Sequence, residues 1–482
     1  MKGQNLGSDT QQRLLIRLCC RRFIPMIRQL SRSSCRAVSP CIALFCIIAF
    51  GLIFLALSVS IVEATSIEKN NQVMLRAILT DLGDPNRWQT LLQPALEELR
   101  KRHPDLDIQL KYTTFPYNMT RAALLESLSN KTAIDLISVD QIWLGELAEK
   151  GFLADLTNKT QEWGKLADFY EANLDGTIFN DRIYGIWAWT DVRGIWYWKD
   201  ILNKSDVSPN SLRTWDGYLA AAKKINSTIL AEKEKGTHTL VQPIHLNGDV
   251  NAPDVWYPYL WMLGGSIVEN RPGHPTKDSY WFPSYNSTNG VKALEFLKKQ
   301  TDIGLKPQSR IDDQFVDRKF AVMLSGSWMP SSFRNGTNVE QIVGFLPVFP
   351  VPDASVQTTT MMGGWQFSIP STSTQKDLAW ELITIMLEPE IFAPWLQQYG
   401  YLPTQSSIGE GPYSTQLRQS IPYYQEMISM IEVGGSRPSI PEYSEIATHI
   451  KQAMDEVFSG AKEPKQALDD AAAKSAEVLG WS

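Results

Sequence analysis

Tryptophan is the residue type that stands out in this chain. There are 16 tryptophans among 482 residues, and many of them cluster. The clustered ones are Trp187, Trp189, Trp196, Trp198, Trp256, Trp261, Trp281, Trp328 and Trp365. A sugar presents flat C–H faces ringed by hydroxyls, so aromatic rings combined with carboxylates and amides make a favourable site for it. The tryptophan content therefore favours carbohydrate binding.

Two of these tryptophans stand beside glycine or serine. Trp328 ends Ser325-Gly-Ser-Trp, and Trp365 ends Gly363-Gly-Trp. Such sequences are typical of turns, where a ring can face a cleft. The alternative is that the rings are ordinary core, because tryptophan is highly buried on average. We expect Trp328 and Trp365 to be functional and leave the other tryptophans open between core and site.

Motifs of the common catalytic and metal sites do not occur in the sequence. The five histidines are scattered and have no HExxH or CxxC companion, and the serine-hydrolase elbow and the Walker A loop are missing. Fifty-two acidic residues could still supply the two facing carboxylates of a glycoside hydrolase, which sequence spacing cannot show. We expect no catalytic residue, no metal and no cofactor, with a secreted glycoside hydrolase as the alternative.

The N-terminal segment predicts a membrane topology signal. Residues 1–36 carry eight basic side chains and one acidic one, whereas residues 41–62 carry no charge. An apolar stretch of that length spans the roughly 30 Å hydrocarbon core, and its basic side stays in the cytoplasm. We expect a cytoplasmic arm over 1–40, a transmembrane anchor over 41–62 and a body at the outer face of the cytoplasmic membrane. A cleaved signal peptide is the alternative.

The body of the chain is acidic and has no cysteine. All five cysteines lie in the N-terminal segment, so the body has neither disulfides nor a thiolate metal site. Outside residues 1–36 the net charge is −13. Because phosphate binding needs a basic face, this charge argues against nucleic acid as a partner.

Seven Asn-x-Ser/Thr sequons lie in the body, more than composition alone would give. This enrichment favours a glycosylated cell-surface protein, with chance in a Ser/Thr-rich chain as the alternative. The acceptor residues are Asn118, Asn130, Asn158, Asn203, Asn226, Asn286 and Asn335.

Strand and helix patterns alternate from residue 72 onward. Residues 73–79, 106–110 and 134–140 predict strands, and the segments between them have apolar residues at helical spacing. A βαβαβ order with short connections implies a parallel or mostly parallel sheet. Ligands of such sheets lie at the carboxyl ends of the strands, where Asp81 and Asp140 fall.

Six segments then follow one another in a characteristic order. They are Asp135-Leu-Ile-Ser-Val-Asp140, Ile183-Tyr-Gly-Ile-Trp-Ala-Trp189, Thr214-Trp-Asp-Gly-Tyr, Phe320-Ala-Val-Met-Leu-Ser-Gly-Ser-Trp328, Gly363-Gly-Trp365-Gln-Phe and Arg437-Pro-Ser-Ile-Pro. In this order they resemble the family-1 extracellular solute-binding proteins of ABC importers, in particular the trehalose/maltose-binding type. Each segment alone is a weak signal, but six in order are specific.

The resemblance implies an α/β fold of the two-lobe periplasmic-binding-protein kind (type II-like), with a hinge between the lobes. It places 72–190 and 351–402 in lobe I, and 191–350 and 403–482 in lobe II. The polar residues over 63–71 predict a linker before lobe I. The resemblance also implies a monomer that delivers a di- or oligosaccharide to the transmembrane subunits of an ABC permease. The sugar itself is not named by the sequence.

The resemblance further implies the ligand-binding residues. Asp140 and Asp191 would accept hydrogen bonds from sugar hydroxyls, and Trp189, Trp328 and Trp365 would flank the rings. The remaining candidates are Gly363 and Gly364 for backbone approach, Trp256 in an aromatic-platform region, and the arginines Arg121 and Arg437.

Overall fold

The structure, a computed structural model, describes seven stretches of the chain. They are residues 71–81, 86–230, 240–242, 252–273, 281–303, 311–334 and 336–481. The predicted cytoplasmic arm and membrane anchor lie outside these stretches. Within the stretches, every helix is too short or too polar to cross a membrane.

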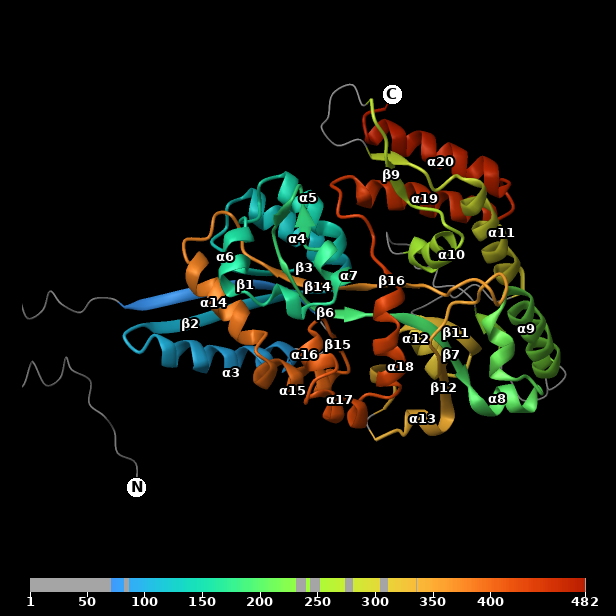
Figure 1. The fold of residues 1–482 in the computed structure, drawn as a ribbon, viewed down its shortest axis with the longest axis horizontal. Coiled ribbons are helices and arrows are strands. Elements are labelled where there is room, and N and C mark those ends of the chain that lie inside the picture. Colours follow the sequence, from blue (N-terminus) through green and yellow to red (C-terminus); the bar gives the residue numbers. More distant parts are fainter. Residues whose placement is uncertain are drawn as a thin grey trace, which may run out of the picture. The chain divides into compact units, whose positions relative to one another are not determined.

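Two β-sheets organise the described residues, and Figure 1 shows them side by side. The first has six strands in the order β15–β6–β14–β3–β1–β2. Their bounds are β1 Gln72–Thr80, β2 Asp107–Phe115, β3 Leu136–Asp140, β6 Ile186–Asp191, β14 Gly363–Ser368 and β15 Leu402–Pro403. Both β2 and β3 pair with β1 in parallel, which confirms the predicted βαβαβ unit.

The first sheet as a whole is mixed, which corrects the expectation of a parallel or mostly parallel sheet. β14 runs antiparallel to β3 and β6, and β15 runs antiparallel to β6. A local strand–helix–strand pattern fixes only the directions of the strands that its own crossover joins. β14 instead enters this sheet after the chain has passed through the second sheet, so the earlier pattern does not set its direction.

Helices flank the first sheet, and the two that connect β1, β2 and β3 are predicted in the sequence. The flanking helices include α3 Asn86–Arg102, α4 Tyr117–Ser129, α14 Lys376–Met386 and α15 Pro389–Tyr399. The predicted apolar face of α3 is buried, and this helix packs against α14 and α15. α4 packs against β1 and β2. The period of 3.6 residues thus places one helix face in the core.

The second sheet has four strands in the order β12–β7–β11–β8. Their bounds are β7 Arg193–Trp198, β8 Leu240–Gln242, β11 Phe320–Gly326 and β12 Val343–Leu346. β7 is antiparallel to β11 and β12, whereas β11 is parallel to β8. The helices packed on this sheet include α8 Lys199–Lys204, α9 Trp215–Leu230 and α11 Thr288–Ile303.

Two further helices end the chain, α19 Tyr443–Phe458 and α20 Pro464–Val478. The chain leaves the helical conformation between them. Gly460 has a φ of +76°, in the left-handed region that favours glycine, and Pro464 takes the first turn of α20.

The chain crosses between the sheets more than once. A single residue, Val192, separates β6 of the first sheet from β7 of the second. Later crossings contain the short strands β13 Thr360–Met361 and β16 Gly434–Gly435, which pair in parallel with each other. This ladder joins two distant chain segments between the sheets. The predicted residue boundaries of the two lobes stay a prediction.

Aromatic side chains fill the core of the first sheet. The Trp88 ring lies 5.8 Å from Trp189 and 6.0 Å from both Phe367 and Trp395, measured between ring centroids. Its Nε1 donates a hydrogen bond of 2.7 Å to the carbonyl oxygen of Thr80. With 1% of its surface exposed, Trp88 contributes almost entirely through packing.

Replacing Trp88 by alanine should lower the free energy of unfolding by about 3–5 kcal/mol, because a cavity replaces a buried ring. Urea denaturation of both proteins measures this difference. Trp88→Phe keeps an aromatic ring, so it should lose clearly less. Equal losses in the two variants would contradict a packing role for Trp88.

Candidate functional site

Five charged side chains form an ion network between the two sheets. Arg437 Nη1 lies 3.2 Å from Asp254 Oδ2, and Arg437 Nη2 lies 3.5 Å from Asp140 Oδ1. Arg193 Nη1 donates to the same Asp254 oxygen at 2.9 Å, and its Nε lies 3.8 Å from Asp191 Oδ1. Asp140 and Asp191 end strands of the first sheet, whereas Arg193 begins a strand of the second. The network therefore connects the two sheets.

Asp140 occupies the carboxyl end of β3, as the sequence predicts. Its Oδ2 accepts a hydrogen bond of 2.8 Å from the Tyr117 hydroxyl, at the start of α4. Its Oδ1 accepts one of 3.3 Å from the backbone N–H of Ile142 and so caps the helical turn that follows. These contacts hold the carboxylate at the strand end, where ligands of such sheets bind.

Arg193 and Asp254 are network members that the sequence does not predict. Asp254 lies in the short 3₁₀ helix Ala252–Val255, and 1% of its side chain is exposed. A buried carboxylate is stable only when it is paired, and here it has two arginines. One acidic residue among 52 gave no signal of this role, although Asp254 lies two residues before the predicted Trp256.

Burial shifts the acid–base behaviour of the network. It raises the pKa of Asp191 to about 6, although Arg193 and Arg437 act in the opposite direction. Burial also raises the pKa of Asp140, against the attraction of Arg437. For Arg437 itself burial lowers the pKa, but Asp254 and Asp140 outweigh it and the net pKa is raised. Across the described stretches, no acidic, histidine and cysteine side chains are grouped so that they could hold a metal ion.

Trp365 lies beside the network on the first sheet. It is part of strand β14 and not of a turn, which corrects the expectation from the adjacent glycines. Strand pairing places it opposite Asp140 on one side and Trp189 on the other. Its half-buried ring stacks on Trp189 at 6.4 Å and meets the rings of Tyr117 and Trp143 edge-on at 6.0 and 5.7 Å.

Trp328 lies beside the network on the second sheet. It follows β11 in a turn, as expected, and its ring is half-buried. The Arg193 guanidinium lies 5.5 Å from the ring centroid, in cation–π geometry. The indole Nε1 donates a hydrogen bond of 3.0 Å to Asp312 Oδ2. The charged network is thus flanked by a partly accessible tryptophan from each sheet.

The paired glycines before Trp365 allow close contacts within the protein. A Cβ on Gly363 would lie 2.7 Å from Asp191 Oδ2. A Cβ on Gly364, whose φ is +152°, would lie 2.1 Å from Trp187 Nε1. The missing side chains let β14 approach Asp191 at Gly363 and Trp187 at Gly364. Approach of a ligand to these glycines stays a prediction.

The remaining predicted residues make other contacts. Arg121 Nη2 lies 2.7 Å from Glu146 Oε2. Trp189 is buried beneath Trp365, and Trp256 is completely buried against Tyr257 and Tyr285. The structure therefore brings together Asp140, Asp191, Gly363, Trp328, Trp365 and Arg437, with Trp189 in the core below and Arg121 and Trp256 outside the network.

Six of the seven predicted glycosylation sites lie in the described stretches. Asn226 and Asn286 are half-buried and donate hydrogen bonds of 2.8 Å to Ile303 O and Asp469 Oδ1. Four acceptors are exposed, namely Asn118, Asn130, Asn158 and Asn203. Asn335 lies outside the described residues.

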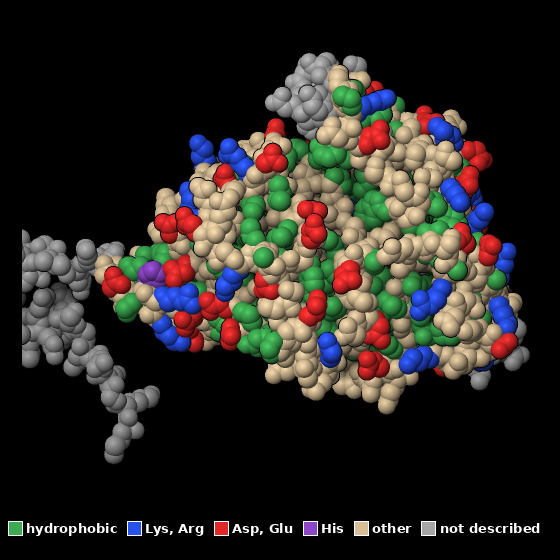
Figure 2. All heavy atoms as spheres, viewed as in Figure 1, with side chains coloured by type: hydrophobic (Ala, Val, Ile, Leu, Met, Phe, Trp, Pro, Cys, Tyr) green, Lys and Arg blue, Asp and Glu red, His purple; other side chains and the backbone are tan. Residues whose placement is uncertain are grey.

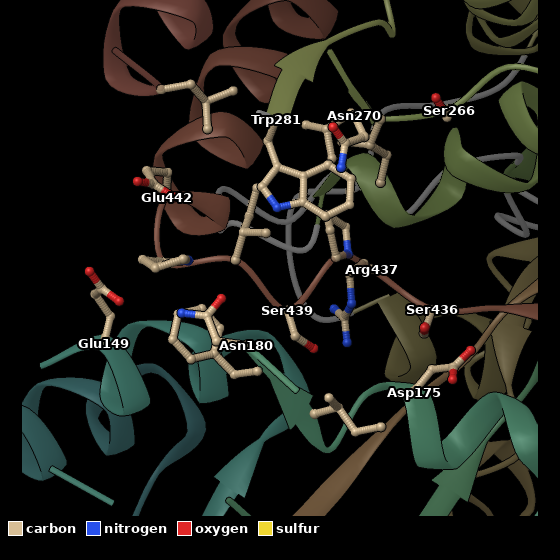
Figure 3. Close-up of a pocket in the computed structure, with 18 of the residues that line it drawn as sticks. Glu149, Asp175, Asn180, Ser266, Asn270, Trp281, Ser436, Arg437, Ser439 and Glu442 are labelled. Atoms are coloured by element: carbon tan, nitrogen blue, oxygen red, sulfur yellow. The ribbon is translucent and has the colours of Figure 1, made fainter. Parts of the chain in front are cut away.

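A cavity of about 1040 Å³ lies next to the crossing segment over residues 436–442. Figure 3 shows Trp281 and Asn270 on one side of this segment and Asn180 on the other. The wall includes Arg437 but not Asp140, Asp191, Trp328 or Trp365. The cavity therefore adjoins the network through Arg437 and does not include its aspartates.

Acidic and basic side chains are interspersed on the molecular face in Figure 2. The basic side chains form no continuous patch on this face. A surface of this kind does not favour binding of a phosphate backbone.

The sequence is similar to those of proteins that bind solutes outside the cell. The family model described as bacterial extracellular solute-binding protein matches residues 95–417. A galactooligosaccharide-binding protein of Bacillus subtilis (strain 168) is 23% identical over 394 residues, which cover 79% of this chain and 85% of that protein.

Solved structures show the same fold. An ABC transporter solute-binding protein of Thermotoga lettingae TMO, bound with α-D-tagatose, has a TM-score of 0.68 and 20% identity, over 84% of this chain and 100% of that one. The maltose-bound MalE3 of T. maritima has a TM-score of 0.67 and 20% identity, over 84% and 99%. The described chain thus has the two-lobe, mixed α/β fold of these proteins.

The difference in free energy of unfolding between Asp191→Asn and the wild type should grow in favour of the variant as the pH rises. The folded-state pKa of about 6 exceeds the ordinary 3.8, so between these values only the folded wild type holds the proton and its stability falls with rising pH. The variant cannot ionise and should gain up to about 3 kcal/mol relative to the wild type between pH 4 and 7. Urea denaturation across this range measures the gain.

The exposed Asp200, changed to Asn, is the matched control for this measurement. A difference between Asp191→Asn and wild type that stays constant from pH 4 to 7 would contradict the raised pKa of Asp191.

Proposed function

The chain belongs to the family of bacterial extracellular solute-binding proteins, and we propose that it captures a di- or oligosaccharide for an ABC importer. Family membership makes it a binding protein that acts outside the cytoplasm, not an enzyme. The glycoside-hydrolase alternative has no support among the relatives compared above. In this proposal the loaded protein, as a monomer, delivers the sugar to the transmembrane subunits of the permease.

The observation that carries the proposal is the ion network with a half-buried tryptophan on each side. Trp365 and Trp328 offer apolar ring faces to the C–H faces of a sugar. Asp140 and Asp191 supply acceptors for its hydroxyls, and Arg437 supplies donors. This combination of aromatic faces and convergent polar groups is typical of carbohydrate sites.

The arrangement of these groups also supports a closing motion. Asp140 and Trp365 belong to the first sheet, whereas Arg193 and Trp328 belong to the second. A sugar that contacts both sets stabilises the conformation in which the lobes are close. Closure about the crossing segments would then mark the loaded protein for the permease.

The cavity beside residues 436–442 is the second candidate location for the sugar. Its volume of about 1040 Å³ suits an oligosaccharide, and its wall carries Trp281, Asn180 and Asn270. We place the sugar at the ion network instead, because two tryptophans and both predicted aspartates meet there. Variants of Trp365 and Trp281 separate the two locations.

Trp365→Ala should lose roughly 1–3 kcal/mol of sugar affinity, because one stacking face is removed. Titration calorimetry with maltose, galactobiose and longer glucans measures the affinity, and melting without sugar reports folding. Trp281→Ala is the matched control and should keep the wild-type affinity. If Trp281→Ala loses affinity and Trp365→Ala keeps it, the sugar binds in the cavity and not at the ion network.

Binding is distinguished from turnover by what happens to the sugar. A bound sugar should raise the melting temperature by mass action and be recovered intact after prolonged incubation. Chromatography of the incubated sugar checks this. Shorter products would contradict the proposed binding role.

The N-terminal segment, in this proposal, anchors the protein to the membrane through residues 41–62. The full chain should sediment with membranes and be released by detergent but not by high salt, because burial of an apolar helix holds it there. A variant without residues 1–62 should be soluble. Release of the full chain by salt alone, or a mature N-terminus near residue 63, would contradict the anchor.

The exposed sequons Asn118, Asn130, Asn158 and Asn203 are proposed to carry glycans. The half-buried Asn226 and Asn286 use their side-chain amides in hydrogen bonds, so a glycan there would disrupt native contacts. Mass spectrometry of peptides from the native source should find the first group modified and the second group unmodified.

A further inference from the structure

The ion network holds three carboxylates and two guanidiniums. Asp140, Asp191 and Asp254 face Arg193 and Arg437, so the network has a net charge of −1 when all five are ionised. A proton on Asp140 would bring it to zero. In neither state does the network carry a positive charge in excess.

Both arginines of the network are engaged by aspartates. Arg193 lies within 3.8 Å of Asp191 and Asp254, and Arg437 lies within 3.5 Å of Asp140 and Asp254. Of the three aspartates in the network, Asp254 is the one that forms ion pairs with both guanidiniums. An incoming carboxylate would therefore displace an aspartate or stay buried without a counter-charge, and either outcome is unfavourable.

Two atoms of the network suit a hydroxyl better than a carboxylate. Asp191 Oδ1 is an acceptor and Arg193 Nε is a donor, they lie 3.8 Å apart, and neither makes a hydrogen bond with the described residues. Both atoms are buried in this conformation. A hydroxyl that reaches them when the lobes open both donates and accepts, so it satisfies both atoms at once. A carboxylate only accepts, so it leaves Asp191 Oδ1 unsatisfied and is repelled by it.

We propose that this network selects uncharged sugars and rejects sugars that carry a carboxylate, and that Asp254 sets this preference by neutralising both arginines. The inference rests on the sugar-binding function proposed above and narrows its substrate class. Asp254 acts through Arg193 and Arg437, so it is a positioning residue. A sugar carboxylate is rejected because it meets the like charge of the aspartates and finds no unpaired arginine.

Matched disaccharides test the preference on the full-length chain in detergent. α-1,4-Linked galactobiose and α-1,4-linked digalacturonate differ only by oxidation of each C6 to a carboxylate, and maltose is compared with its analogue oxidised in the same way. Calorimetry at pH 7.5 should show that the neutral member of a pair binds at least 100-fold more tightly. An acidic member that binds as tightly as its neutral partner would overturn the proposal. Binding of no member would instead contradict the sugar-binding function itself.

Asp254→Asn should lower the ratio of the acidic sugar's dissociation constant to the neutral sugar's at least tenfold. It removes the carboxylate that pairs with both guanidiniums, and it brings the ionised network from a net charge of −1 to zero. Its matched control is Asp200→Asn, which removes an exposed carboxylate that pairs with Arg318 in the same lobe. The control should keep the wild-type ratio. A merely structural residue would change the dissociation constants of both sugars together. An unchanged ratio of these constants in a folded Asp254→Asn variant would therefore overturn the role of Asp254.

Arg193→Gln provides an independent readout if Asp254→Asn does not fold. This change makes the network more negative, so it should raise the ratio of the acidic sugar's dissociation constant to the neutral sugar's. A lower ratio in Arg193→Gln than in the wild type would overturn the proposal. Melting curves without sugar confirm that each variant is folded at the temperature of the titration.

Discussion

Arg437 and Asp254 are a buried ion pair, with 2% and 1% of their side chains exposed. Separating two charges that are out of water is strongly unfavourable, so each fixes the position of the other. Arg437 also reaches Asp140 at the end of β3, and Asp254 also holds Arg193 at the start of β7. The pair therefore ties the crossing segment to both sheets, and the rest of the candidate site is built around it.

The aromatic core supports this site from the first sheet. Trp365 stacks on Trp189, whose ring lies 5.8 Å from the buried Trp88. Side chains at such density have few alternative positions, so the half-buried ring of Trp365 is held in place. A rigid aromatic face loses little conformational entropy on binding, which favours affinity for a flat apolar surface.

The crossing segments bring residues of both sheets into one candidate site. Only Val192 separates β6 from β7, so Asp191 and Arg193 stay close however the sheets move. Trp328 and Trp365, in contrast, are attached to different sheets. In the proposed function, a sugar between these two rings acts on the angle between the lobes, while the charged centre at the crossing stays intact.

Local patterns in the sequence determined much of this protein. Helical and strand periodicity located β1, α3, β2, α4 and β3, because alternation and 3.6-residue spacing act over a few residues. Motif order pointed to the two-lobe family and to residues such as Asp140, Asp191 and Arg437.

Tertiary structure alone decided the direction of β14 and the membership of Arg193 and Asp254 in the site. Arg193 and Asp254 are 61 residues apart, and Asp254 and Arg437 are 183 residues apart. No local spacing relates such residues, since they meet only when the chain crosses between the sheets. Buried charges choose partners by distance in space, and that distance exists only in the folded chain.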